Sequence, residues 1–170
     1  VEKEVVHQTK PLKLKSKKNL TTITAKDLKV VFDETTGLLT TYEFESKSLL
    51  KAGFRANFWR ALTDNDVANG TLERCGVWKN KGRELELKSF SAQLFEEDKL
   101  AIVTTQFEDK DLLVTVEFDY QIRAEGVMHV QLRFVPQVSE LPELPRLGLY
   151  LLLPQEYDQM TWLGRGPHEN

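Results

Sequence analysis

The chain has 170 residues, of which 41% are hydrophobic and 29% are charged. These values predict one globular domain with a hydrophobic core and room for a short piece of a neighbour. The net charge of −3 disfavours a nucleic-acid partner, because binding to phosphates favours a basic balance. No apolar run reaches the roughly 18–20 residues that span a bilayer, and residues 1–10 have no apolar core of a signal peptide. The sequence therefore predicts neither a nucleic-acid nor a membrane partner.

The first half of the chain contains a predicted hairpin. Residues 28–32 (LKVVF) are rich in β-branched and aromatic side chains, which favour a strand. Residues 33–37 carry the polar residues and the glycine of a turn. In the strand that follows, we expect Leu38, Tyr42 and Phe44 to line one face.

Residues 55–82 break the alternating pattern. They combine aromatic residues without a period of two, an Asn69-Gly70 pair and the run TLERCGVWKNK. This composition predicts a loop with at most short helical turns around residues 71–81. Long loops on a β scaffold are where binding and catalytic residues usually lie, so this segment is the first place to look for function.

The second half of the chain predicts an antiparallel meander. Strands are expected at residues 84–95, 99–107, 111–123 and 128–134, with a polar turn at residues 108–110 and a second turn at residues 124–126. Side chains alternate between the two faces of a strand, so one face of the third strand should be buried. That face would carry Leu112, Val114, Val116, Phe118, Tyr120 and Ile122.

The end of the chain predicts a crossover and one more strand. Residues 136–146 are punctuated by prolines and should connect two sheets or strands. Residues 147–153 form a short apolar run that ends at Pro154, and Gly148 favours a buried strand over a helix. The whole pattern predicts an all-β, antiparallel sandwich.

The sequence shows no self-contained active site. His7, His129 and His168 lie far apart and in no metal-binding spacing, and His129 should face solvent on its hairpin. The single cysteine, Cys75, is expected to be a small buried side chain. Glycoside hydrolysis needs two carboxyls roughly 5–10 Å apart, and no local feature selects such a pair among the 26 acidic residues.

The sharpest polar cluster is the segment 58–66, with the sequence FWRALTDND. A calcium-binding EF-hand is excluded, because Asn69 stands at the sixth position instead of glycine and Cys75 at the twelfth instead of glutamate. Two interpretations stay open from the residues themselves. The Asp and Asn side chains either bond nearby backbone amides in a turn, or they join an aromatic ring in a loop that faces a sugar.

Four segments resemble motifs of one family. The segment 58–66 resembles the FWRAPTDND signature of the small-chain domain of β-galactosidases from glycoside hydrolase family 2. Trp78-Lys79 followed by Gly82 resembles the family's WKxAG, and residues 144–148 (LPRLG) resemble LPRxG. Residues 162–170 resemble W-x-G-x-G-P-x-E-N. The four matches occur in the family's order and are specific in combination.

This resemblance implies an antiparallel β-supersandwich of the galactose mutarotase-like kind. Residues 16–170 would be the N-terminal part of the small-chain domain, and residues 1–15 the end of a preceding immunoglobulin-like domain and its linker. The catalytic glutamates would lie in a separate TIM-barrel domain of the parent enzyme. Expected partners are the other domains, a β-galactoside substrate and further copies of the enzyme. No cofactor is expected in this piece, whereas the parent would use magnesium and sodium.

The resemblance also implies roles for individual residues. The loop 67–71 should lie nearest the mouth of the active site. Residues expected to line that mouth are Trp59, Arg60, Asp64, Asn65, Asp66, Ala68 and Asn69. Residues expected to support the structure are Arg146, Trp162, Gly164, Gly166, Pro167, Glu169 and Asn170.

The sequence departs from the family pattern in two ways. Leu62 stands where the family usually has proline, so the bend there is less rigid. The chain also starts at Val1 and stops within a motif, which predicts a piece of a larger bacterial enzyme that is inactive alone and tends to self-associate. Its compartment, cytoplasm or periplasm, is not distinguished by the sequence.

Three other functions remain open from the sequence. The chain could be a free-standing carbohydrate-binding module or a structural assembly domain. A mutarotase-like epimerase shares the implied fold, but it would need a histidine acid and a glutamate base that converge in one cleft.

Overall fold

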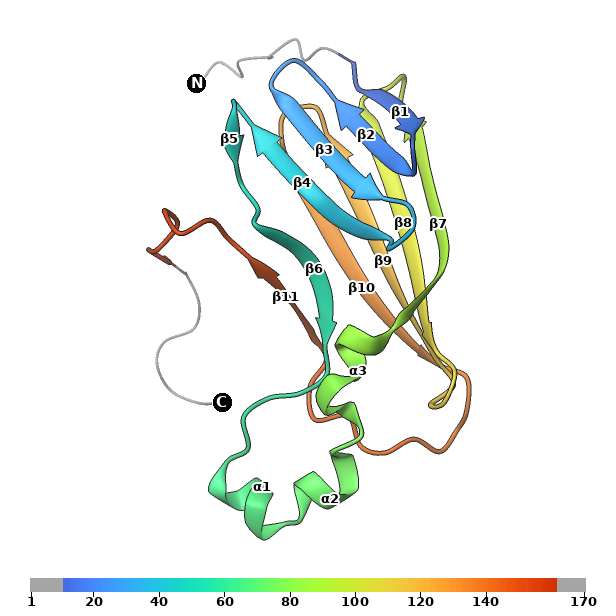
Figure 1. Cartoon of the computed structure of the whole chain (residues 1–170), viewed down its shortest axis with the longest axis vertical. Helices are drawn as coiled ribbons and strands as arrows, with labels where there is room; N and C mark the ends of the chain where they lie inside the picture. Colours follow the sequence, from blue (N-terminus) through green and yellow to red (C-terminus); the bar gives the residue numbers. More distant parts are fainter. Residues whose placement is uncertain (1–10, 162–170) are drawn as a thin grey trace, which may run out of the picture.

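The computed structural model describes residues 11–161 and shows an antiparallel β-sandwich (Figure 1). One sheet has five strands in sequential order: β1 (Lys13–Lys17), β2 (Leu20–Thr24), β3 (Leu28–Asp33), β4 (Leu38–Phe44) and β5 (Lys47–Ser48). The facing sheet has the order β10-β9-β8-β7, with β7 (Glu86–Phe95), β8 (Leu100–Asp109), β9 (Val114–Arg123) and β10 (Met128–Pro136). The predicted all-β class and the predicted meander are confirmed.

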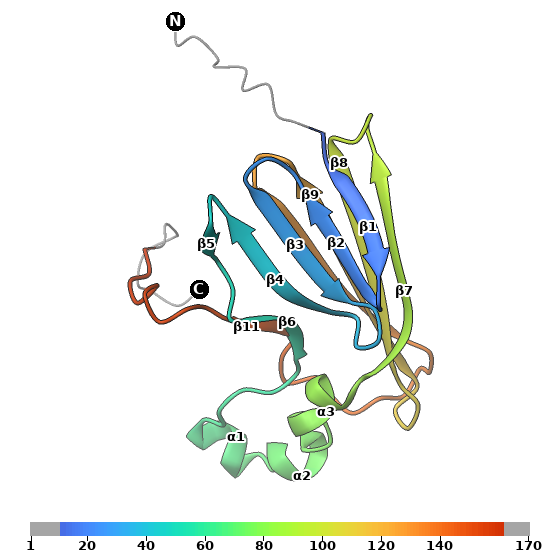
Figure 2. The same cartoon turned by 45° about the horizontal axis from the view of Figure 1, so that its top comes forward.

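A third, two-stranded sheet lies beside the sandwich. It pairs β6 (Ala52–Asn57) with β11 (Gly148–Leu152) in antiparallel register, and β6 also contacts β4. The crossover predicted at residues 136–146 is confirmed, because it carries the chain from β10 to β11. Figure 2 shows the three short helices at the end of the molecule opposite to β5. None of the helices within residues 11–161 is long and apolar enough to cross a membrane.

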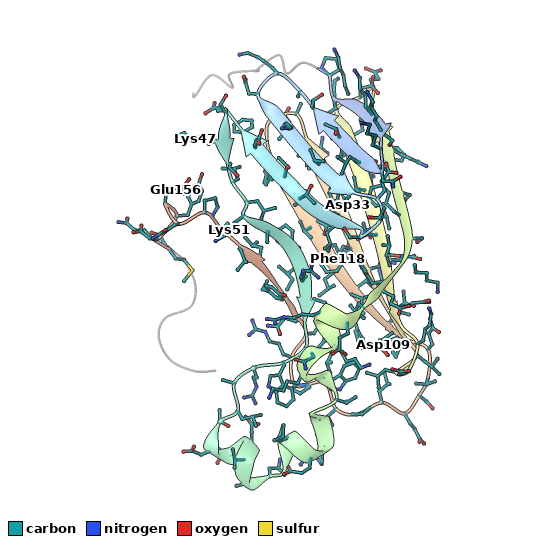
Figure 3. All side chains as sticks on the ribbon, viewed as in Figure 1. Asp33, Lys47, Lys51, Asp109, Phe118 and Glu156 are labelled. Carbon is teal, nitrogen blue, oxygen red and sulfur yellow. The ribbon has the colours of Figure 1, made fainter. Side chains whose placement is uncertain are left out.

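The core lies between the two large sheets. The predicted inner face of β9 is confirmed, since Val116, Phe118 and Tyr120 are all at most 2% exposed. Figure 3 shows Phe118 between the sheets. The ring of Phe32 on β3 meets the ring of Tyr120 edge-on, at a centroid distance of 5.0 Å. His129 is exposed on the outer face, as predicted. Alternate side chains of the facing strands therefore point inward and form the core of the sandwich.

The turn between β8 and β9 lies later than predicted. The sequence placed it at residues 108–110 and began the next strand at residue 111, but β8 continues to Asp109 and β9 begins at Val114. The carboxylate of Asp109 accepts backbone N–H bonds from Asp111 at 3.0 Å and Leu112 at 2.9 Å. A side chain that bonds its own backbone two and three residues on nucleates a turn there. These bonds move the turn to residues 110–113.

A bulge in β4 changes the face that was predicted for Leu38. Pairing between β3 and β4 shifts after Val31, so that Phe32 pairs with Leu39. Leu39 is therefore the core residue, at 1% exposure, while Tyr42 stays on the predicted inner face opposite Val30. An extra residue in one strand of a pair reverses the side-chain alternation beyond it, and the sequence alone gives no signal for that insertion.

The predicted loop at residues 55–82 is more ordered than expected. Its first residues complete β6, and helical structure starts before residue 71. The three helices are α1 (Asp64–Ala68), α2 (Thr71–Cys75) and α3 (Trp78–Glu84). We call residues 58–84 the helical segment. At the other end of the chain, β1 begins at Lys13 and pairs with β2, while the predicted domain boundary after residue 15 stays a prediction.

Candidate functional site

The helical segment is anchored to the sandwich by three aromatic rings. Phe58, just after β6, and Trp78, at the start of α3, are each 1% exposed. Their ring centroids lie 5.7 Å apart, and both rings meet Phe134 of β10 edge-on at 5.5 and 5.9 Å. The indole N–H of Trp78 donates to the carbonyl of Pro142 at 3.2 Å. This aromatic trio joins the start of the helical segment and the start of α3 to β10.

A buried ion pair fixes α3 to the four-stranded sheet. The Lys81 ammonium lies 2.8 Å from a carboxylate oxygen of Asp109, and the two side chains are 15% and 5% exposed. Burial raises the pKa of Asp109, but hydrogen bonds from Lys81, Leu112 and Asp111 outweigh it and lower that pKa overall. The hydrogen bond to Asp109 raises the pKa of Lys81. Figure 3 shows Asp109 at the end of the sheet that adjoins α3.

The start of α1 is held by a network around Asp66. Its carboxylate accepts two bonds from the Arg60 guanidinium, at 2.6 and 2.9 Å. It also accepts the Thr63 backbone N–H at 2.8 Å, while the Thr63 hydroxyl accepts the Asp66 N–H at 3.3 Å. Such a reciprocal pair is a capping box, which satisfies two otherwise unpaired donors at a helix start. The Arg60 side chain, followed by Thr63, holds the pKa of the Asp66 carboxyl well below its usual range.

Replacing Asp66 with alanine should loosen α1 selectively. The variant loses the carboxylate that bridges Arg60 and Thr63, so the first turn of the helix should open more often. Amide hydrogen exchange should speed up at Val67 and Asn69, whose N–H groups donate within α1. The matched control is Asp64→Ala in the same helical turn, since the Asp64 carboxylate makes no bond within residues 11–161. Equal acceleration in both variants would contradict a specific role for Asp66.

Other predicted mouth residues lie on the outer side of α1. Asp64, Asn65, Ala68 and Asn69 are all exposed. The Arg74 guanidinium donates to the carbonyl oxygen of Asn69 and, at 3.0 Å, to the Glu143 carboxylate. The structure thus brings Asp64, Asn65, Ala68 and Asn69 into one exposed tip, where the Asn69 side-chain oxygen accepts a bond from Arg74 at 3.2 Å. Arg60 and Asp66 bond to each other, and Trp59 lies half-buried outside the tip. A sugar contact by this tip stays a prediction.

Of the predicted structural residues, Arg146 can be placed. It is exposed in the connection before β11, and its guanidinium lies against Gly148. Trp162, Gly164, Gly166, Pro167, Glu169 and Asn170 lie outside the described residues. Cys75 is buried as predicted, and burial raises the pKa of its thiol.

A cleft of about 360 Å³ lies between α3 and the two-stranded sheet. Its polar and aromatic lining consists of Asn57, Trp59, Lys79, Asn80, Arg83 and Tyr150. Gly82 forms part of the floor, and a Cβ there would come within 2.2 Å of the Ala56 carbonyl oxygen. The absence of that side chain lets α3 lie directly on the backbone of β6.

Most of the cleft residues were missed from the sequence. Trp59 was predicted as a site residue, but Asn57, Asn80 and Tyr150 were not. Lys79 and Arg83 are four residues apart and therefore share one face of a helix. A predicted helix over all of residues 78–84 would have placed Lys79 and Arg83 side by side.

The described part of the chain shows no group of three or more potential metal-binding side chains. Three of its carboxyls, those of Asp33, Asp66 and Asp109, have clearly shifted pKa values, and all three are lowered. A glycosidase needs one carboxylic acid with a raised pKa as its proton donor. None of these three carboxyls is suited to that role.

Comparison with known proteins places the chain in a family. The family described as "Beta galactosidase small chain" matches residues 24–170. The chain belongs to the β-galactosidase small-chain family. It is 33% identical over 149 residues to a β-galactosidase of Priestia megaterium, covering 88% of this chain and 14% of the relative. It is 31% identical over 145 residues to a β-galactosidase of Clostridium acetobutylicum, covering 85% of this chain and 16% of the relative.

A third relative supports the same family. It is a β-galactosidase of Lactobacillus delbrueckii subsp. bulgaricus, 32% identical over 149 residues. The match covers 85% of this chain and 14% of that protein. The chain thus spans about one seventh of the length of the curated relatives that it matches. The resemblance inferred from the four sequence motifs is confirmed.

Proposed function

We propose that this chain is a non-catalytic part of a β-galactosidase, an enzyme that hydrolyses terminal non-reducing β-D-galactosides. Its role would be to support and wall an active site built by a separate TIM-barrel domain. The observation that carries this proposal is the family match over residues 24–170, which links the sandwich to β-galactosidases.

The exposed tip at α1 is the proposed contribution to the active-site mouth. Asp64, Asn65 and Asn69 offer carboxylate and amide groups on α1 and at its C-cap. Figure 1 shows α1 at the end of the molecule that carries the helices. The aromatic trio and the Lys81–Asp109 pair fix α3 to the sandwich. The tip therefore extends from a base of fixed position. A fixed base limits how far the polar groups of the tip can move from the mouth, which favours productive binding. Magnesium or sodium in the parent would bind to other domains, and the parent is proposed to be a homo-oligomer.

A first test uses the purified 170-residue chain. With a chromogenic β-galactoside it should give no product above the buffer blank, and calorimetry with lactose should show no heat of binding. Turnover by the pure chain would overturn the non-catalytic role. Tight lactose binding by the chain alone would favour a free-standing carbohydrate-binding module instead.

A second test places the tip in a complete enzyme. Residues 24–170 would replace the matching segment of the Priestia megaterium β-galactosidase, and Asn65→Ala/Asn69→Ala would be compared in that chimera. Loss of substrate contacts at the mouth should raise KM about tenfold while kcat changes less. The control Lys47→Gln changes the opposite end of the domain and should leave KM unchanged (Figure 3). An unchanged KM in the asparagine variant would contradict the proposal that the tip forms part of the active-site wall.

A further inference from the structure

The cleft between α3 and the two-stranded sheet carries positive charge that is not balanced by neighbouring carboxylates. Lys79 and Arg83 both line it, and no acidic side chain does. The helical segment has five cations, and Arg60, Arg74 and Lys81 each form an ion pair. The remaining two, Lys79 and Arg83, are the two in the cleft, and neither pairs with a carboxylate among residues 11–161. An anion is the group that would complement this lining.

The guanidinium of Arg83 lies over an aromatic ring. Its central carbon lies 5.9 Å from the centre of the Tyr150 ring, within the range of a cation–π contact. A guanidinium stacked in this way keeps its N–H donors free, and their planar fork matches the oxygens of carboxylate and phosphate groups. Arg83 is thereby available to bind an anion.

Amides and a second aromatic ring complete the cleft. The side-chain oxygen of Asn57 accepts the Trp59 backbone N–H at 3.2 Å, which orients the Asn57 amide and leaves its NH2 donors available. The side chain of Asn80 forms no hydrogen bond within the described part of the chain, so both of its polar groups are available. Planar amides can bond to pairs of hydroxyls, and the half-buried Trp59 offers an aromatic face to the apolar side of a sugar ring.

We propose that this cleft binds a small anionic saccharide, a monosaccharide that carries a carboxylate or a phosphate. Lys79 and Arg83 would bind the anion, while Asn57, Asn80 and Trp59 would contact the sugar ring. The volume of about 360 Å³ falls within the usual range for small-molecule sites. The site differs from the exposed tip of α1, and it does not depend on the role proposed for that tip.

The test is a titration of the 170-residue chain with four probes. Calorimetry and NMR of the side-chain NH2 groups of Asn57 and Asn80 would measure binding. D-galacturonate and D-galactose 6-phosphate distinguish the two anions, and D-galactose and inorganic phosphate isolate the two halves of the ligand. At least one anionic sugar should bind with a Kd on the order of 1 mM. Neutral galactose and inorganic phosphate should each bind at least about tenfold more weakly, because each lacks half of the contacts.

Variants give a second, independent measurement. Lys79→Gln and Arg83→Gln should each weaken binding of the anionic sugar about tenfold. Both side chains are exposed, so the fold should be retained. The control Lys47→Gln removes one positive charge from β5 and should not alter binding. Equal affinity for galactose or inorganic phosphate, unchanged binding by both Lys79→Gln and Arg83→Gln, or no binding of either anionic sugar would overturn the proposal.

Discussion

Replacing Trp78 with alanine should lower the free energy of unfolding by about 3–5 kcal/mol. The indole is 1% exposed, and the substitution leaves a cavity between Phe58 and Phe134. It also leaves the Pro142 carbonyl without its indole donor. The loss is a large part of the roughly 5–15 kcal/mol by which a domain is usually stable. Urea denaturation followed by circular dichroism would measure it, and Tm should fall on the order of 10 °C.

Two further variants separate the contributions of Trp78. Trp78→Phe keeps a ring in the aromatic trio but removes the N–H donor, so its effect should be smaller than that of Trp78→Ala. Val67→Ala is the matched surface control, since Val67 is 68% exposed on α1 and its loss should cost within about 0.5 kcal/mol. A loss below about 1 kcal/mol for Trp78→Ala would show that the trio does not anchor the helical segment.

Replacing Lys81 with alanine should destabilise the protein by about 3 kcal/mol at neutral pH. The cause is the Asp109 carboxylate, whose side chain is only 5% exposed and which loses its cation in the variant. The double variant Lys81→Met/Asp109→Asn leaves no buried charge, so it should be more stable than Lys81→Ala. Urea denaturation of the wild type and both variants at pH 7 would measure these differences.

The effect of Lys81→Ala should depend on pH in a defined direction. Folding lowers the pKa of Asp109, so its contribution is present above the unfolded value of about 3.9 and is lost as pH falls through the lower folded value. Folding raises the pKa of Lys81, so that contribution persists below about 10.4 and is lost as pH rises through the higher folded value. The wild-type and Lys81→Ala stabilities should therefore differ by a constant amount between about pH 5 and 9 and converge in acid. A difference that does not shrink in acid would contradict this origin.

The sandwich could be predicted from the sequence because its signal is local. Alternation of apolar residues along 112–122 is the direct result of one buried strand face, and the structure buries every second residue from Val114 to Ile122. Leu112 is the exception, because it lies in the turn before β9 and is half-buried. The turn at residues 110–113 and the bulge opposite Val31 could not be predicted in the same way. Both depend on particular hydrogen bonds and pairings across strands, such as those of Asp109, that a repeating pattern does not encode.

The candidate site was predictable in part. The cluster 58–66 indicated the right segment, and the family motifs gave its context. The cleft was not foreseen, because it combines Tyr150 on β11 with Lys79 and Arg83 on α3, about 70 residues earlier in the chain. The sequence also did not predict that these two cations share a helix face. Each helix is too short to show the repeating apolar stripe by which a helix is recognised. Contacts between distant segments need the folded backbone.

The helical segment has an uneven distribution of buried side chains, and this predicts an uneven local stability. No residue of α1 is buried, two residues of α2 are, and α3 contributes Trp78 to the aromatic trio. Regions with few buried contacts open at a small free-energy cost, whereas core elements open only with global unfolding. The amides should thus exchange fastest at α1 and slowest at α3. A substrate or neighbouring domain could therefore reshape the tip without melting the sheets behind it.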